Sequence, residues 1–134
     1  MRISRVQPDG LHATPGYHHV TIVEEGRTAH LAGQCPLDAA GALVGADDPL
    51  AQADQVAANA LVALAAVGAA PQDVVRSVVY VATDDRAVLA GVWHRLNAGP
   101  LAEAFTTAST LLGVTVLGFA GQLVEVDLTA ALAD

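Results

Sequence analysis

The spacing of apolar positions along the chain predicts two helices. Between residues 48 and 68, apolar residues recur at intervals of three and four, which places them on one face of a helix. They are Leu50, Ala53, Ala57, Leu61 and Leu64. Asp48 and Pro49 suit the start of this helix, and Gly68 suits its end. A second helix is expected to begin at an aspartate near residue 84 and to stop at Gly99.

Runs rich in β-branched residues predict the strands. They are residues 18–24, 28–35, 73–82, 109–117 and 122–130. A turn at 118–121 is expected to join the last two runs as a hairpin, and residues 1–16 are expected to be irregular. With a short strand expected near Leu43, this order favours an α+β two-layer sandwich. In it, about six strands form one mixed sheet, and both helices cover the same face.

The last predicted strand separates apolar from polar positions. Val124, Val126 and Leu128 share one face, whereas Glu125 and Asp127 share the other. The apolar face suits the helix layer, so Glu125 is expected on the face of the sheet that the helices leave uncovered. A carboxylate in such a place must be hydrogen-bonded, paired or hydrated. A functional role is one explanation for it, and a solvated strand edge is the other.

The composition indicates what covers that second face. Hydrophobic residues make up 53% of the 134 residues and charged residues 15%. A single domain spanning residues 1–134 therefore has little charge with which to cover its surface. We expect a subunit interface in a closed homo-oligomer. The alternative is that 28 alanines raise the apolar fraction without forming an adhesive patch.

The charged residues and the single cysteine exclude several classes of function. The formal net charge is −8, and all six basic residues are arginines. The absence of lysine excludes a Schiff-base lysine and a P-loop lysine. The chain also lacks the basic face that nucleic-acid binding requires. Because Cys35 is the only cysteine, an intrachain disulfide and a cysteine-based zinc site are excluded.

The hydropathy of the chain bears on its location. No stretch stays apolar over the roughly 18 residues that a transmembrane helix needs. The first eight residues lack the apolar centre of a signal peptide. We therefore expect a cytoplasmic protein without a membrane partner.

Five short segments carry a resemblance to a known family. They are Ala32-Gly33-Gln34-Cys35-Pro36-Leu37-Asp38, Gln52 followed by Asn59, Gly68 followed by Asp73-Val74-Val75, Val79-Tyr80, and Leu123-Val124-Glu125-Val126. In this order and spacing the chain resembles the Rid family, the reactive intermediate deaminases also called YjgF or RidA-like proteins. The resemblance covers residues 17–130.

The resemblance implies a fold, an assembly and an activity. The fold would be chorismate-mutase-like, and the assembly a homotrimer with the sheets lining its centre and ligand clefts between neighbouring subunits. The activity would be hydrolysis of enamines and imines such as 2-aminoacrylate, without a metal or an organic cofactor. In that chemistry a carboxyl group positions the attacking water and moves its proton. Glu125 matches the family's acidic group, Tyr17 its cleft tyrosine, and Gly33 the backbone that contacts the ligand.

The sequence departs from the family where the substrate carboxylate is bound. Deaminase members carry Pro-Ala-Arg at the start of the fifth strand, but this chain has Thr107-Ala108-Ser109. Losing the arginine fork removes charge-assisted hydrogen bonds worth about 1.5–3 kcal/mol. Arg76 and Arg95 are the only candidates to replace it, and neither lies in the motif. We therefore predict an imine or enamine substrate that lacks the usual carboxylate.

Glu125 is thus the predicted catalytic residue, and a second set is predicted to bind the small-molecule substrate. That set is Tyr17, Gly33, Gln34, Cys35, Thr107 and Ser109. Cys35 is alternatively a small buried strand residue, and Ser109 alternatively fills space. Either His18 or His19 could line the cleft, but adjacent strand residues point to opposite faces and cannot chelate one metal ion together.

Two other functions compete with the enzyme. The first is a non-catalytic trimer that binds a small metabolite. The second is RNA cleavage, which has also been attached to the family but conflicts with the net charge of −8.

Overall fold

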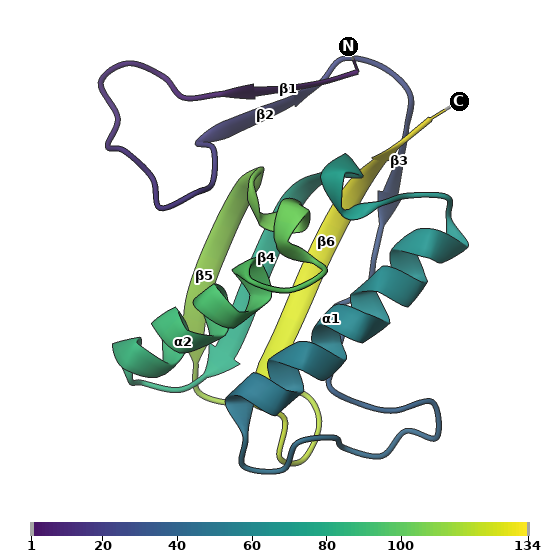
Figure 1. The fold of residues 1–134 in the computed structure, drawn as a ribbon, viewed down its shortest axis with the longest axis vertical. Coiled ribbons are helices and arrows are strands. Elements are labelled where there is room, and N and C mark those ends of the chain that lie inside the picture. The colour runs from purple at the N-terminus through teal and green to yellow at the C-terminus, as the bar shows by residue number, and fades with distance from the viewer. Residues whose placement is uncertain (1, 134) are drawn as a thin grey trace.

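Four strands and two helices form two layers, and two further strands stand apart as a hairpin (Figure 1). The computed structural model describes residues 2–133. The strands are β1 (Ile3–Val6), β2 (Val20–Val23), β3 (Arg27–His30), β4 (Val74–Ala82), β5 (Ala108–Val114) and β6 (Val124–Leu132). The helices are α1 (Pro49–Ala66) and α2 (Arg86–Asn97), with 3₁₀ turns η1 (Pro71–Asp73) and η2 (Ala102–Phe105). Both helices lie on the same face of the larger sheet, which confirms the α+β prediction.

Each helix begins at an aspartate cap. The Asp48 carboxylate accepts a hydrogen bond from the N–H of Ala51 at 3.1 Å, and the Asp85 carboxylate accepts one from the N–H of Ala87 at 2.8 Å. Gly68 follows the end of α1 with a φ of 75°, a conformation that favours glycine. The start and end predicted for the first helix are confirmed. No helix within residues 2–133 is long and apolar enough to cross a membrane.

The larger sheet has the strand order β3-β6-β4-β5. β4 pairs parallel with β5 across the α2 crossover, and β6 pairs antiparallel with the other edge of β4. The predicted hairpin at residues 118–121 is therefore wrong, because β4 lies between the two strands that it was to join. The α2 crossover is long enough to return the chain for parallel pairing, so β5 pairs with one edge of β4. The other edge of β4 then pairs with β6. Residues 115–123 carry the chain across the end of β4.

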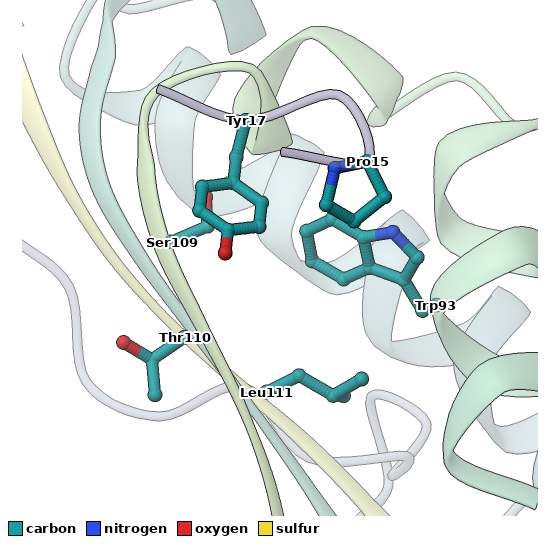
Figure 2. A pocket seen from close by; sticks show the side chains of 6 residues that line it. All are labelled: Pro15, Tyr17, Trp93, Ser109, Thr110 and Leu111. Carbon is teal, nitrogen blue, oxygen red and sulfur yellow. The ribbon is translucent and has the colours of Figure 1, made fainter. Parts of the chain in front are cut away.

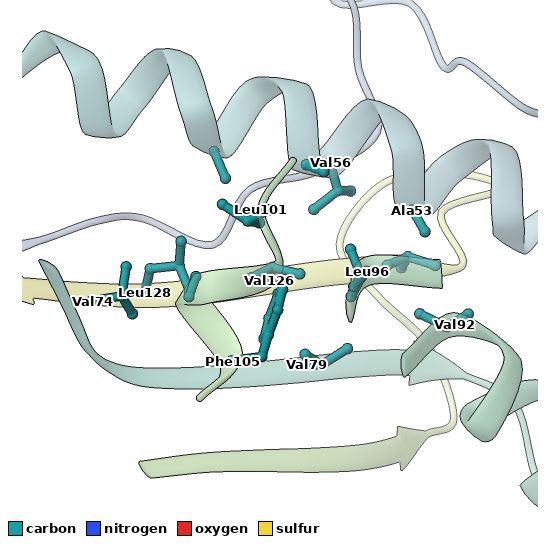
Figure 3. Close-up of a cluster of buried hydrophobic side chains, with 14 of the residues drawn as sticks. Ala53, Val56, Val74, Val79, Val92, Leu96, Leu101, Phe105, Val126 and Leu128 are labelled. Atoms are coloured by element: carbon teal, nitrogen blue, oxygen red, sulfur yellow. The ribbon is translucent and has the colours of Figure 1, made fainter. Parts of the chain in front are cut away.

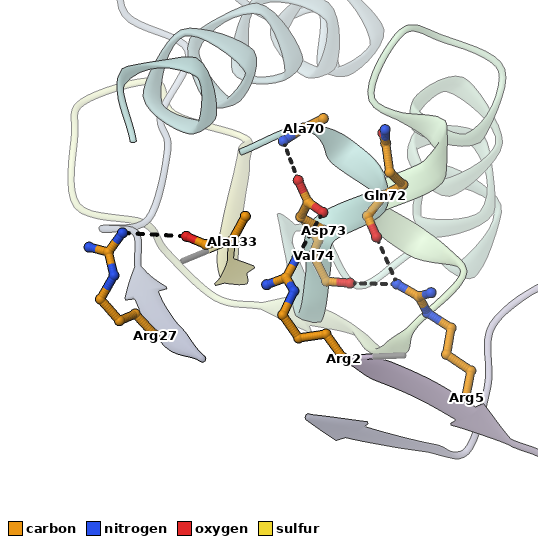
Figure 4. A network of polar contacts seen from close by, with 8 residues as sticks. All are labelled: Arg2, Arg5, Arg27, Ala70, Gln72, Asp73, Val74 and Ala133. Carbon is orange, nitrogen blue, oxygen red and sulfur yellow. Dashed lines mark hydrogen bonds and ion pairs between the residues drawn. The ribbon is translucent and has the colours of Figure 1, made fainter. Parts of the chain in front are cut away.

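The first two strands also differ from the expectation of a single six-stranded sheet. Residues 3–6, expected to be irregular, form β1, which among the described strands pairs with β2 alone. The hairpin is tied to the main body by Arg5, whose Nη2 donates to the carbonyl oxygens of Gln72 and Val74 at 3.1 and 2.9 Å (Figure 4). Four residues with an arginine among them give too short a pattern for a strand to be recognised.

The core fills the space between the helices and the sheet (Figure 3). Val124, Val126 and Leu128 of β6 are fully buried in it, as the alternation along that strand predicts. Phe105 of η2 is the largest side chain that is fully buried. On the other face of β6, Glu125 and Asp127 are only partly buried because no helix covers them.

Candidate functional site

Glu125 lies on the uncovered face of the sheet, directly opposite Tyr80 of β4. The chain that follows β3 runs beside it. The backbone of Gln34 exchanges two hydrogen bonds with that of Val126, with N···O distances of 2.7 and 3.1 Å. This pairing brings the segment Gly33-Gln34-Cys35 next to the carboxylate.

Two donors bind the same oxygen of that carboxylate. Gln122 Nε2 lies 3.1 Å from Glu125 Oε1, and Cys35 Sγ lies 3.3 Å from it. The other oxygen, Oε2, lies against Gly33, where an added Cβ would be only 2.2 Å away. Oε2 accepts no hydrogen bond from residues 2–133. The carboxylate therefore has one occupied oxygen and one available oxygen.

Cys35 is a protonated donor in this arrangement. Burial, the hydrogen bond to Glu125 and the negative charge of that residue raise the pKa of the thiol from 9.0 to about 11. At neutral pH the side chain is a thiol rather than a nucleophilic thiolate. Helix α1 fixes its backbone, because Asn59 Nδ2 donates to the carbonyl oxygens of Cys35 and Leu37, both at 2.8 Å.

A pocket of about 400 Å³ lies between β5, α2 and the loop before β2. Figure 2 shows Trp93 reaching into it from α2, and Tyr17 and Pro15 from the loop. Ser109, Thr110 and Leu111 of β5 complete the lining. The rings of Tyr17 and Trp93 meet edge to face, with centroids 6.4 Å apart. The lining offers aromatic surface and hydroxyl groups, and none of the lining side chains within residues 2–133 is charged.

Ser109 and Thr107 both use their hydroxyl groups inside the fold. Ser109 Oγ lies 2.5 Å from Ser77 Oγ and 3.0 Å from the carbonyl oxygen of Thr107. Thr107 is fully buried, and its hydroxyl donates to the carbonyl oxygen of Val75 at 2.9 Å. Ser109 lines the pocket, whereas Thr107 does not.

The predicted site residues form two groups that lie on opposite faces of the sheet. Ser109 pairs with Ser77, a buried position on the helix side, and Glu125 pairs with Tyr80 on the uncovered side. Gly33 and Cys35 lie with Glu125, and Tyr17 lies with Ser109. Gln34 does not join the group of Glu125: it pairs with Val126, a buried position on the helix side, and its side chain lies beside α1 and donates to the carbonyl oxygen of Ala32 at 3.0 Å.

Neither arginine considered as a replacement lines the pocket. Arg95 donates from Nε and Nη2 to the two carboxylate oxygens of Asp54, at 2.9 and 2.7 Å. This hydrogen-bonded pair lowers the pKa of Asp54. Arg76 is exposed and pairs with Thr129, which places it on the uncovered face. The part of the chain that the structure describes therefore places no cation in the pocket lining to bind a carboxylate.

The adjacent histidines are bonded to backbone carbonyl oxygens. His18 Nδ1 contacts the carbonyl oxygen of Thr106, and His19 Nε2 lies 2.9 Å from that of His12. Within residues 2–133, no group of three histidine, cysteine or acidic side chains is placed to hold a metal ion.

Comparison with known proteins identifies the family. The sequence model described as Endoribonuclease L-PSP matches residues 9–132. The solved structure of YyfB from Yersinia pestis, a Rid protein of unknown function, is 36% identical, with a TM-score of 0.87 over 98% of this chain and 100% of that chain. This chain belongs to the Rid family.

More distant Rid proteins share the fold. YyfA of Yersinia pestis is 20% identical, with a TM-score of 0.67 over 97% of this chain and 99% of that chain. A member of the YjgF/YER057c/UK114 family from Mycobacterium tuberculosis is 23% identical, with a TM-score of 0.64 over the same shares. No curated protein matches this Rid protein significantly.

Three residues of the site in this Rid protein are not evident from its sequence. Gln122 is only 4% exposed and donates to Glu125, yet its place beside a turn glycine gives no sign of burial. Trp93 falls within the second predicted helix, but its approach to Tyr17 depends on tertiary packing. Pro15 lies in a loop whose course the sequence does not specify.

Proposed function

We propose that this Rid protein hydrolyses or tautomerises imines or enamines that lack the family's usual carboxylate, in clefts shared between the subunits of a homotrimer. The observation that carries the proposal is the carboxylate of Glu125, which has one oxygen held by two donors and the other available. The chain has no lysine, so the imine must belong to the substrate rather than to the protein.

Glu125 is suited to general acid–base catalysis. In hydrolysis, Oε2 accepts a proton from the water that attacks the imine carbon, and the proton then passes to the leaving nitrogen. The C=N bond is replaced by C=O, and ammonia or an amine is released. In tautomerisation of an enamine to an imine, Oε2 removes the proton from the enamine nitrogen. The carboxyl group of Glu125 then delivers a proton to the β-carbon of the enamine. Cys35, with its raised pKa, supports the carboxylate as a neutral donor.

A second subunit is proposed to complete the cleft. The pocket and Glu125 lie on opposite faces of one sheet, so one ligand reaches both where the uncovered face of one subunit meets the pocket of its neighbour. Leu112 supports such an interface, because it pairs with Tyr80 on the uncovered face and is 41% exposed in the single chain.

Mixing two variants tests the shared cleft. Glu125→Gln and Tyr17→Ala each weaken one half of it. Random trimers of equal amounts of the two chains would contain about a quarter intact clefts, so activity should recover to about a quarter of the parent level. Absence of recovery in trimers that do contain both chains would place the whole site within one subunit.

The lining of the pocket supports the substrate class. Its aromatic surface and hydroxyl groups suit an apolar or neutral polar substituent, and Arg95 is already bound to Asp54. Turnover should be surveyed with carboxylate-free imines beside imines made in situ from amino acids. We expect the carboxylate-free imines to react faster.

Glu125→Gln should lower the rate on every active substrate by about 10²- to 10⁴-fold. Asp127→Asn is the matched control, because Asp127 lies two residues further along the same face of β6. Parent-like turnover by Glu125→Gln would remove Glu125 from the reaction. A small molecule that co-purifies unchanged, with no imine turned over, would favour the metabolite-binding protein instead.

RNA is not proposed as a substrate, although the family description names an endoribonuclease. The net charge of −8 and the lack of lysine oppose binding to phosphates. No salt-dependent binding to RNA is expected.

A further inference from the structure

We infer that Cys35 and Gln122 are positioning residues, which hold Glu125 by Oε1 and so make Oε2 the oxygen that works on the substrate. The inference rests on the proposed function, since it says how the carboxylate of that site is aimed. It gives Cys35 a role through Glu125 in place of direct contact with the substrate.

The amide of Gln122 is fixed from three sides. Its Nε2 donates to Glu125 Oε1 and to the carbonyl oxygen of Val124, both at 3.1 Å, and its Oε1 accepts from the N–H of Phe119 at 3.1 Å. The side chain is 4% exposed, so water does not replace these partners. With both amide hydrogens used, Gln122 presents one hydrogen to Glu125 in one direction.

Cys35 reaches the same oxygen from the segment that follows β3. Its backbone is held by Asn59 of α1, and its Sγ lies 3.3 Å from Glu125 Oε1. A second acceptor, the carbonyl oxygen of Gly33, lies 3.6 Å from Sγ. The raised pKa of the thiol agrees with a proton kept between sulfur and carboxylate.

Gly33 leaves space for the other oxygen. A Cβ at this position would lie 2.2 Å from Oε2 and 2.7 Å from Cδ of Glu125. Two donors on Oε1 and an absent side chain beside Oε2 together select one orientation of the carboxylate. A proton-transfer group gains rate from such orientation, because the reacting atoms must be aligned before the proton moves.

The first test needs no turnover. Cys35 is the only cysteine, so the ultraviolet absorbance of the thiolate reports its pKa once the absorbance of the same protein carrying Cys35→Ser, which keeps both tyrosines, has been subtracted. The parent should titrate near 11, and Glu125→Gln should titrate lower, with at least about tenfold more thiolate at pH 9. Asp127→Asn should match the parent. An unchanged titration in Glu125→Gln would show that the thiol does not hold the carboxylate.

The second test separates positioning from binding. On an imine whose turnover depends on Glu125, Cys35→Ala and Gln122→Met should each lower kcat about tenfold and leave KM nearly unchanged. Cys35→Ser should recover most of the rate, because a hydroxyl restores the donor. If Gln122→Met unfolds the loop, the kcat values of Cys35→Ala and Cys35→Ser still test whether Cys35 positions Glu125. Equal kcat for Cys35→Ala and the parent would overturn the inference.

The two proposals fail in different ways. Loss of the proposed function appears as a parent protein that turns over no imine. If the positioning inference fails, the parent is active but the Cys35 variants have the same kcat as the parent. Alternatively, the pKa of the thiol is the same in Glu125→Gln as in the parent.

Discussion

The two faces of the β4–β6 pair are stabilised by different interactions, apolar packing on one and hydrogen bonds on the other. On the helix side, Val124, Val126 and Leu128 are fully buried and pack their side chains into the apolar core. On the uncovered side, Glu125 is partly buried and is held by Gln122 and Cys35. Packing volume selects the residues of the first face, and hydrogen-bond geometry selects those of the second. Substitutions should therefore cost mainly stability on one face and mainly activity on the other.

Leu128→Ala should show the largest loss of stability. Removing a fully buried leucine side chain leaves a cavity, so the free energy of unfolding should fall by about 2–5 kcal/mol in urea denaturation. Asp127→Asn, one residue away on the other face, should cost less than about 1 kcal/mol. A larger cost for Asp127→Asn than for Leu128→Ala would break the comparison of the two faces.

Gly33→Ala should affect both stability and rate. The new methyl group would lie 2.2 Å from Glu125 Oε2, so the carboxylate must move away. Overpacking of this kind costs about 1–3 kcal/mol, and turnover should fall by at least about tenfold. Gly118→Ala is the control, because nothing lies within 4 Å of a Cβ there. Parent-like kinetics for Gly33→Ala would mean that the orientation of Oε2 is unimportant.

Ser109→Arg should shift substrate preference. It adds a guanidinium to a pocket whose lining carries no charge, at the position where the family's deaminases have arginine. The ratio of kcat/KM for carboxylate-bearing over carboxylate-free imines should rise about 10- to 100-fold. Ser109→Met, long but uncharged, should not raise it. An equal rise in both variants would point to pocket shape rather than to charge.

Stability should also depend on the protonation of Cys35. Burial and Glu125 raise the pKa of the folded thiol from 9.0 to about 11, so below pH 9 both the folded and unfolded chains hold the proton. As pH rises from 9 to about 11, the unfolded chain releases it first, and the folded state loses stability. Cys35→Ser should lack this part of the decline in denaturation curves measured across that range. If the free energy of unfolding fell equally with pH in the parent and in Cys35→Ser, the raised pKa of the thiol would be contradicted.

Arg95→Gln should have the smallest effect. Arg95 and its partner Asp54 are both about half exposed, with side-chain exposures of 49% and 54%, so solvent screens the pair. Neither residue lines the pocket. KM should stay unchanged for every substrate, and the melting temperature should hardly move. A raised KM for a carboxylate-bearing imine would show that Arg95 reaches the ligand.

Local patterns specify much of the fold. The aspartate cap and the apolar spacing of Ala53, Ala57 and Leu64 specify α1, although Leu50, the first residue of the predicted stripe, is 40% exposed. The alternation around Glu125 specifies which way β6 faces. The neighbours of β6 were not predictable, because strand order depends on where the α2 crossover lies rather than on any local residue. β1 was not predictable either, because four residues hold too little pattern.

The candidate site divides in the same way. The approach of Gly33 to Glu125 agrees with the family resemblance, which assigns both residues to the ligand cleft. The roles of Gln122 and Trp93 could not be predicted from the sequence. The burial of the Gln122 amide and the place of Trp93 in the pocket lining depend on residues distant in sequence. Only the folded chain shows them.

Tyr17 lies on the loop between β1 and β2, which within residues 2–133 pair with each other and with no other strand. Apart from Arg5, the ties of this hairpin to the body include Thr21, whose hydroxyl lies 2.5 Å from that of Thr107. Such a unit can open locally while β4 and β6 stay paired, so amide hydrogens of β1 and β2 should exchange with solvent first. Because Pro15 and Tyr17 line the aromatic pocket from the loop of this hairpin, local opening of β1 and β2 would change one wall of that pocket while the core stays folded.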